Sequence, residues 1–269
     1  MRIAPLLLVT LAACTVGDDV PVASTPHDHA PSLDRAKTQK SPNVTDHGGA
    51  ILTASHTVAI YWGTATDFPS DLQAGMASLL GNIGGSSYLH TIDQYMRGAT
   101  ATSTYGGAVS DPTAPPKSAP NTSALGAEVC KLFAHPDPSA LYIVFTSNAP
   151  KINYCAWHDK TTCNGVTFQV AYVPNQALLA GCSPTTGNAG DLGCNSYSAG
   201  TVTAADSVAH ELIETITDAH IDAWYDANRA EIADKCEYQY DACVALGADH
   251  WQIQKEWSNA VSGCVQTTN

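Results

Sequence analysis

His210, Glu211 and Glu214 have the types and the spacing of a metal site with a base beside it. His210 and Glu214 lie four residues apart in the stretch AHELIE, residues 209–214, so on a helix they share one face. A neutral imidazole and a carboxylate are both competent zinc ligands. Glu211 is next to His210 and could take the proton of a metal-activated water. The pattern therefore predicts zinc at His210 and Glu214, with Glu211 as the catalytic base.

This stretch resembles the H-E-x-x-H helix of the zincin peptidases, with glutamate in place of the second histidine. The resemblance implies a zinc-dependent metallopeptidase that acts on a peptide or protein substrate. No methionine follows Met96, so the Met-turn of the metzincins is absent. A surface helix rich in charged residues is the alternative interpretation, because histidine and glutamate are ordinary residues on helices.

The third zinc ligand is left open by this spacing. Asp218 could reach the metal if the helix bends near Thr217. Glu231 or Asp234 could fold back onto the helix if a disulfide at Cys236 held their segment. The candidate metal ligands are therefore His210, Glu214, Asp218 and Asp234, with Glu231, His220 and His250 as further alternatives.

Acidic residues are concentrated in the same part of the chain. Ten of the 25 acidic residues fall between Asp206 and Asp241, and several of them recur every four residues. Like charges four apart destabilise a helix by about 0.2–0.5 kcal/mol per pair. So dense a cluster either is solvated or holds divalent ions, and Ca²⁺ is therefore possible beside Zn²⁺. An EF-hand is excluded, because no D-x-D-x-D-G loop occurs here.

Buried strands and amphipathic helices must position this helix. β-Branched and aromatic residues predict strands at 57–62, 141–145 and 166–173. The second is apolar throughout, as in a strand buried on both faces. Apolar periodicity predicts helices at 67–80 and 123–133, besides the one already described. This order predicts an α/β or α+β fold: a single zincin-like domain with a central sheet, an active-site-type helix and a disulfide-braced C-terminal part.

Composition excludes several classes of protein. The chain has 269 residues, of which 44% are apolar and 14% charged, so it can bury a core and is not disordered. Its formal net charge of -13 excludes nucleic-acid binding through a basic surface. After the first residues, no apolar run approaches the roughly 20 residues of a membrane-spanning helix. We expect a monomer whose partner is a peptide or protein substrate, or a cell-surface ligand.

The first residues predict export and a lipid anchor. A short basic start precedes an apolar stretch of signal-peptide length that ends at Ala13. The Cys14 that follows completes a sequence similar to a bacterial lipobox, with lipid attached to its thiol. The predicted parts are a lipoprotein signal peptide at 1–13, a flexible tether at 14–45 and a folded domain at 46–269.

These features predict an outer-membrane lipoprotein of the bacterial cell envelope, facing the periplasm or the cell surface. Contact with the membrane would be only through the lipid on Cys14. Secretion after an ordinary signal peptide is the alternative, in which Cys14 is incidental.

Eight cysteines follow Cys14, and an even number in an exported chain predicts up to four disulfides. Short loops that join 155 to 163, 182 to 194 and 236 to 243 are plausible, although eight cysteines allow 105 connectivities. The close C-x-x-C pairs of a zinc knuckle do not occur. His158 lies inside the first of these loops, and we interpret it as a surface-loop residue rather than a ligand.

Short motifs follow one another in the first part of the domain: DHGGAILT from Asp46, TVAIYWG from Thr57, VFTS from Val144 and AGTVT from Ala199. In this order they resemble the EXORDIUM (phosphate-induced protein 1) family over roughly residues 46–203. The resemblance implies an extracellular protein of that family's fold, linked in plants to growth responses and without a settled biochemical activity. Its plant members lack the helix motif, so the likeness is to bacterial relatives with an H-E-x-x-E-x-x-T-D run. The alternative function is a non-catalytic EXORDIUM-like extracellular binding module, stabilised by calcium if by any metal.

Overall fold

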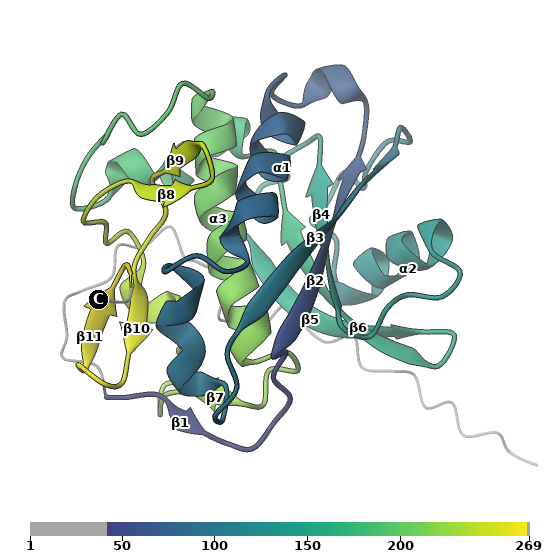
Figure 1. Ribbon diagram of the computed structural model, residues 1–269. Helices are drawn as coiled ribbons and strands as arrows, with labels where there is room; N and C mark the ends of the chain where they lie inside the picture. The colour runs from purple at the N-terminus through teal and green to yellow at the C-terminus, as the bar shows by residue number, and fades with distance from the viewer. Residues whose placement is uncertain (1–41, 268–269) are drawn as a thin grey trace, which may run out of the picture.

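The computed structural model describes residues 42–267 of the chain. They form a central sheet with helices against both of its faces (Figure 1). The predicted signal peptide, Cys14 and the tether up to residue 41 lie outside the described residues. None of the helices within 42–267 is both long enough and apolar enough to cross a membrane.

The central sheet has five strands in the order β3-β2-β4-β6-β5. β3 (Thr102–Asp111), β2 (Ala54–Trp62), β4 (Ala140–Thr146) and β6 (Val166–Val173) run parallel, and β5 (Trp157–Cys163) pairs antiparallel with β6. The three predicted strands are confirmed, and the fold is mixed α/β as expected. The sequence does not predict the two edge strands, because they are rich in Thr, Ser, Gly and charged residues.

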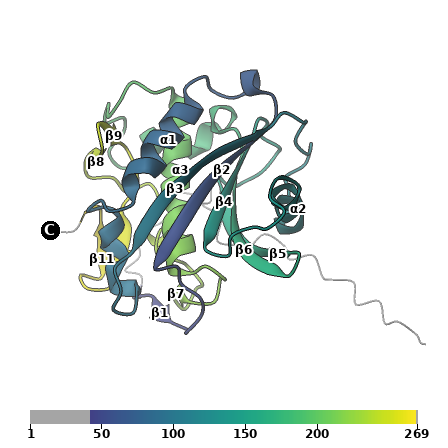
Figure 2. The same cartoon turned by 45° about the vertical axis from the view of Figure 1, so that its right-hand side comes forward.

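Two apolar layers fill the space between the sheet and its helices. α2 (Thr122–Leu132) covers one face of the sheet, and α1 (Leu72–Ile83) and α3 (Ala199–Thr217) cover the other (Figure 2). Successive side chains of β4 alternate between the layers, so that Phe145 packs toward α1 and α3 while Val144 packs toward α2. This alternation explains the continuous apolar run of β4, which is buried on both faces as predicted.

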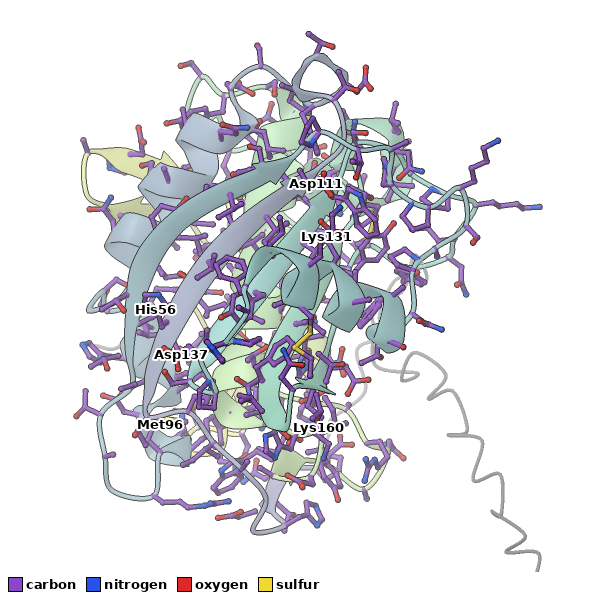
Figure 3. All side chains as sticks on the ribbon, turned by 90° about the vertical axis from the view of Figure 1, so that its right-hand side faces the viewer. His56, Met96, Asp111, Lys131, Asp137 and Lys160 are labelled. Carbon is purple, nitrogen blue, oxygen red and sulfur yellow. A yellow bond between two sulfur atoms is a disulfide. The ribbon has the colours of Figure 1, made fainter. Side chains whose placement is uncertain are left out.

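A polar cluster ties the C-terminal end of α2 to the sheet. Lys131 forms ion pairs with Asp111, at the end of β3, and with Glu128, one turn earlier on the same helix. Figure 3 shows Lys131 and Asp111 together at this end of α2. Burial raises the pKa of Glu128 to about 7, and the neighbouring Asp111 adds to this rise. The cluster lies on the opposite face of the sheet from α3.

α3 is buried along almost its whole length, so the alternative interpretation as a charged surface helix is wrong. It packs against the sheet on one side, and the C-terminal hairpins lie on its other side (Figure 1). Asp71 holds its N-terminus, because the Asp71 carboxylate accepts hydrogen bonds from the Ser198 backbone N–H at 2.6 Å and the Ser198 hydroxyl at 2.7 Å. Charged residues on such a helix need partners inside the protein.

Short elements complete residues 42–267. β1 (Thr45–Asp46) pairs with β7 (Trp224–Tyr225), and Val44 is already buried. The folded part therefore begins before the predicted boundary at residue 46. β8 (Val244–Leu246) pairs with β9 (Asp249–Trp251), and β10 (Glu256–Ser258) pairs with β11 (Gly263–Val265). The described 3-10 helices are η1 (Ala65–Asp67), η2 (Leu89–Tyr95), η3 (Gln176–Leu178), η4 (Ala180–Cys182), η5 (Pro184–Thr186) and η6 (Asp234–Cys236).

Four disulfides brace the described residues, which agrees with the predicted number, but the predicted short loops are wrong. β5 separates Cys155 from Cys163 at roughly 3.3 Å per residue, which puts the two sulfurs far out of reach of each other. The cysteines instead pair between elements, at separations of 27 to 49 residues. Such bridges form in an oxidising compartment, outside the cell or in the periplasm. The pairs are Cys130–Cys163, Cys155–Cys182, Cys194–Cys243 and Cys236–Cys264.

Candidate metal centre

The middle of α3 carries three buried ionisable side chains. His210, Glu211 and Glu214 are each at most 1% exposed, between the sheet and the C-terminal segments. Two further acids, Glu231 and Asp234, follow β7 in the chain and return to the same part of α3. Residues that are distant in sequence thus converge on one helix face.

Three of the four candidate ligands meet at one point. His210 Nε2 lies 3.3 Å from Glu214 Oε1 and 3.7 Å from Asp234 Oδ1, and these three residues are called the His210 triad. Two ligands of a tetrahedral zinc ion, each about 2.1 Å from the metal, are roughly 3.4 Å apart. The two distances from His210 Nε2 are close to this value. A disulfide from Cys236 to Cys264 anchors the Asp234 segment, as expected for Cys236.

A second group of the same kind lies on the other side of Glu214. His158 Nε2 is 3.5 Å from Glu214 Oε2 and 3.4 Å from Glu231 Oε2, and these three residues are called the His158 triad. The interpretation of His158 as a surface-loop residue is wrong, because it lies in β5 and its side chain is 3% exposed. The sequence indicates Glu231 only as an alternative ligand, and the structure places it in this group.

No local pattern in the sequence indicates a role for His158. The segment around His158 contains Trp157 and two threonines at 161–162, residue types that are common in strands. That signal would place His158 on a strand, but not beside α3. The contact between β5 and α3 arises from the packing of the sheet against the helix.

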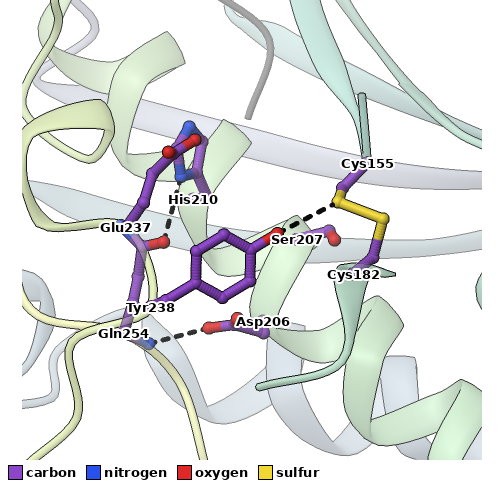
Figure 4. A pocket seen from close by; sticks show the side chains of 8 residues that line it. All are labelled: Cys155, Cys182, Asp206, Ser207, His210, Glu237, Tyr238 and Gln254. Carbon is purple, nitrogen blue, oxygen red and sulfur yellow. Dashed lines mark hydrogen bonds between the residues drawn. A yellow bond between two sulfur atoms is a disulfide. The ribbon is translucent and has the colours of Figure 1, made fainter. Parts of the chain in front are cut away.

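The neighbours of His210 fix which ring nitrogen faces the acids. The amide nitrogen of Gln254 donates to the Ala233 carbonyl oxygen at 2.7 Å and to the Lys255 carbonyl oxygen at 3.3 Å. The amide oxygen of Gln254 therefore faces His210 Nδ1, at 3.2 Å (Figure 4). Because this oxygen can only accept, the proton of the neutral ring sits on Nδ1. In that neutral form Nε2 has a lone pair for a metal. Without a metal, burial lowers the pKa of His210, but Glu214 and Asp234 outweigh it and raise that pKa well above its usual range.

Backbone N–H groups orient two of the carboxylates. The Asp234 N–H donates to Glu214 Oε1 at 3.1 Å, and the Glu231 N–H donates to Asp234 Oδ2 at 3.0 Å. The remaining oxygens point to the histidines: Glu214 Oε2 faces His158, and Asp234 Oδ1 faces His210. The loop that contains Glu231 and Asp234 is therefore built around the two triads.

Several polar atoms of this cluster have no hydrogen-bond partner within residues 42–267. They are both carboxylate oxygens of Glu211 and of Glu231, Oε2 of Glu214, Nε2 of His210 and both ring nitrogens of His158. By contrast, the buried Asp206, one turn before His210, accepts hydrogen bonds from the Tyr240 hydroxyl and the Gln254 N–H. Burying a carboxylate without a partner is so costly that the group takes up a proton instead.

The pKa values of the cluster show this effect. Burial raises the pKa of Glu211 to about 8 and raises that of Glu231 well above its usual range. Burial acts on Glu214 in the same direction, but the protonated, positively charged rings of His210 and His158 outweigh it and lower the Glu214 pKa to about 2. The cluster by itself therefore holds protons in places where a cation would satisfy the same carboxylates. Metal binding would release those protons.

Asp218, the fourth candidate ligand, joins neither triad. It ends α3, where its Oδ1 accepts the N–H groups of Asp222 and Ala223 at 2.6 Å each. His220 is partly buried and His250 is exposed. Among the described residues, neither histidine belongs to a group with metal-binding spacing.

A small cavity lies beside His210, between α3 and the Cys155–Cys182 disulfide (Figure 4). Its volume of about 10 Å³ gives space for about one water molecule. Tyr238 lines it, and the Tyr238 hydroxyl lies 3.5 Å from the Cys155 sulfur and 3.3 Å from the Gly181 carbonyl oxygen. A water molecule therefore fits next to His210, whereas a peptide would need the Tyr238 segment to move.

Comparisons of the chain with protein-family models, with curated proteins and with solved structures gave no significant match. The fold and the cluster on α3 are therefore the basis on which a function can be assigned.

Proposed function

We propose that this chain is an exported, zinc-dependent hydrolase of the peptidase type. The observation that carries the proposal is the convergence of His210, Glu214 and Asp234 at the spacing of zinc ligands. This convergence lies inside a cluster whose buried polar atoms otherwise lack partners. The three residues of the His210 triad are the proposed zinc ligands.

The chemistry of the ligands favours zinc over calcium. Ca²⁺ takes about six to eight oxygen ligands and prefers carboxylates, carbonyls and water. Each triad instead contributes one imidazole nitrogen and two carboxylates, which suits Zn²⁺ in a four-coordinate site. A water molecule would complete this coordination as the fourth ligand.

Glu211 is the proposed catalytic base. It follows a ligand directly in sequence, it is buried, and neither of its oxygens has a hydrogen-bond partner among the described residues. Its raised pKa suits a group that accepts and returns a proton near neutral pH. A bound zinc ion would lower the pKa of a water molecule. Glu211 would take that water's proton and pass it to the leaving amine.

The ligand set also predicts a pH dependence for the activity. Two carboxylates donate more negative charge to the metal than two histidines would, so the zinc becomes a weaker Lewis acid. We therefore expect a pH optimum somewhat above that of zincins with two histidine ligands.

The proposed location is the cell envelope. Four disulfides support an oxidising compartment outside the cytoplasm. Cys14 is the proposed lipid attachment site, with peptides or proteins of the periplasm or cell surface as substrates. Recovery of the protein in the soluble fraction, without detergent, would contradict the anchor.

The test is a comparison of Glu211→Gln with the wild type, using the purified mature chain. Glu211→Gln keeps the shape of the side chain but removes the base. We expect it to retain zinc, measured by elemental analysis, and to lose peptide hydrolysis by about two to four orders of magnitude. Asp241→Asn is the control, because Asp241 belongs to the same acidic region but is 60% exposed. Equal hydrolysis rates in the wild type and Glu211→Gln would contradict the mechanism.

One observation favours the alternative, a non-catalytic EXORDIUM-like module that binds a cell-surface ligand. The metal-binding atoms are enclosed, and the cavity beside His210 is only about 10 Å³. A metal in such a closed site could serve stability alone. Wild-type protein that binds zinc but cleaves nothing in a broad peptide pool would support this module. Calcium in place of zinc would support its calcium-stabilised form.

A further inference from the structure

We propose that the cluster on α3 binds two divalent cations, which share Glu214 as a bridging ligand. One cation would lie in the His210 triad, and the other in the His158 triad. The inference rests on the proposed metal centre and extends it by a second position.

The two oxygens of Glu214 face different ligand groups. Oε1 lies 3.3 Å from His210 Nε2, and Oε2 lies 3.5 Å from His158 Nε2. A carboxylate that points one oxygen at each of two sites is the geometry of a bridging ligand. Two-metal hydrolase sites commonly place their ions about 3.5–4 Å apart.

A single ion cannot take all five residues. Ligand atoms at about 2.1 Å from one ion are at most about 4.2 Å apart, even when they lie on opposite sides of it. Within each triad the ligand atoms all lie within 4.8 Å of one another, but the five residues do not form one group under this limit. The two triads have only Glu214 in common, so their ligand atoms define two positions.

The side chains at the second position give independent support for a bound cation. Both ring nitrogens of His158 and both carboxylate oxygens of Glu231 lack hydrogen-bond partners among the described residues. Their side chains are 3% and 1% exposed, so bulk water does not satisfy them. His158 Nε2 points between Glu214 and Glu231, where a cation would contact all three groups.

The test is the number of metal ions bound per chain. The mature wild-type protein is equilibrated with Zn²⁺, freed of loosely bound metal and analysed for zinc. We expect two zinc ions per chain, one in Glu231→Gln, one in Asp234→Asn, and two in the exposed control Asp241→Asn. Circular dichroism of each variant shows whether it is folded.

The outcomes separate this inference from the proposed function. One zinc per wild-type chain, unchanged by Glu231→Gln but lost in Asp234→Asn, would overturn the second position and leave the His210 site intact. Folded wild-type protein without zinc would overturn both. Loss of Glu211-dependent hydrolysis bears on the mechanism alone and leaves the count of ions unchanged.

A spectroscopic measurement on the wild type avoids the risk that a variant fails to fold. The apoprotein is titrated with Mn²⁺ and followed by electron paramagnetic resonance. Two ions bridged by one carboxylate are close enough for their spins to couple. We expect a coupled signal to grow between one and two equivalents of Mn²⁺. Uncoupled signals at two bound equivalents would overturn the bridged arrangement.

Discussion

At His210, a single hydrogen bond decides which ring nitrogen is available to a metal. The Gln254 oxygen accepts the Nδ1–H, and its own orientation is fixed because its amide nitrogen donates to two carbonyl oxygens. Without this acceptor the neutral ring could carry its proton on Nε2, where the proton would block the metal. Such supporting contacts hold the tautomer and the direction of a histidine ligand.

Gln254→Ala should therefore weaken zinc binding without removing any ligand. We expect the zinc affinity to fall about 10-fold to 100-fold, measured by competition with a chromophoric chelator. Gln252→Ala is the matched control, because Gln252 is equally buried but its amide nitrogen donates to the Gly190 and Pro184 carbonyl oxygens. An equal loss of affinity in both variants would mean that the effect is general destabilisation.

At the residue scale, the sequence predicts those parts of the site that depend on local spacing. His210 and Glu214 share a face on any helix, and Cys236, two residues after Asp234, forms a disulfide as expected. His158 could not be predicted, because its place depends on how β5 packs against α3. Asp218 needs a bend near Thr217 to reach the metal, but α3 ends at Thr217 and the Asp218 side chain turns to backbone N–H groups instead.

At the scale of elements, the parts of the fold that the sequence predicts are those buried on both faces. β2, β4 and β6 are central strands with apolar runs, and they lie where expected. β3 and β5 lie at the edges of the sheet, where one side of the strand is in water and polar residues are tolerated. β5 is mostly polar, so its sequence gives only a weak strand signal and none for the contact of His158 with α3.

Glu128 on α2 should make the unfolding free energy of the protein depend on pH. The pKa of Glu128 is about 7 in the folded protein, above its ordinary value of 4.5, because burial disfavours its charged form. Protonated Glu128 therefore stabilises the fold at low pH, and this contribution is lost as the pH rises through 7. In Glu128→Gln the side chain does not titrate, so the loss should be absent.

The measurement is urea unfolding of both proteins at pH 5 and at pH 8. We expect the unfolding free energy of the wild type to fall more between these two values than that of Glu128→Gln, by about 1–2 kcal/mol. The metal cluster is unchanged in both proteins, so its own titration cancels in the comparison. The same pH dependence in both proteins would contradict the role of Glu128.

At the scale of the whole molecule, the C-terminal part of the chain packs on α3 and supplies two of the five triad residues. Glu231 and Asp234 come from this part, and so does Gln254, whereas the sheet supplies only His158. The buried acids of α3 repel the acids of the C-terminal part, so this part of the chain must be held against α3. The disulfides that join cysteines from distant elements do so.

Loss of the Cys236–Cys264 disulfide should therefore lower the affinity for zinc, whereas loss of the Cys194–Cys243 disulfide should not. Cys236 ends η6, the short helix that begins with Asp234, so its loss frees the segment that carries one triad ligand. Cys194–Cys243 joins the loop before α3 to the segment just before β8 and touches neither triad. The bridges close 28 and 49 residues, so chain entropy predicts similar losses of stability, roughly 4 kcal/mol for each.

We expect replacement of Cys236 and Cys264 by alanine to lower the zinc affinity about tenfold or more, because metal binding must then also order the loop. Replacement of Cys194 and Cys243 should leave the affinity within about twofold of the wild type. Both double variants are compared at a temperature where circular dichroism shows them folded. Since the two losses of stability are alike, a difference in zinc affinity must come from the place of the bridge. Equal affinities would show that the Asp234 segment is held by its packing on α3 rather than by the disulfide.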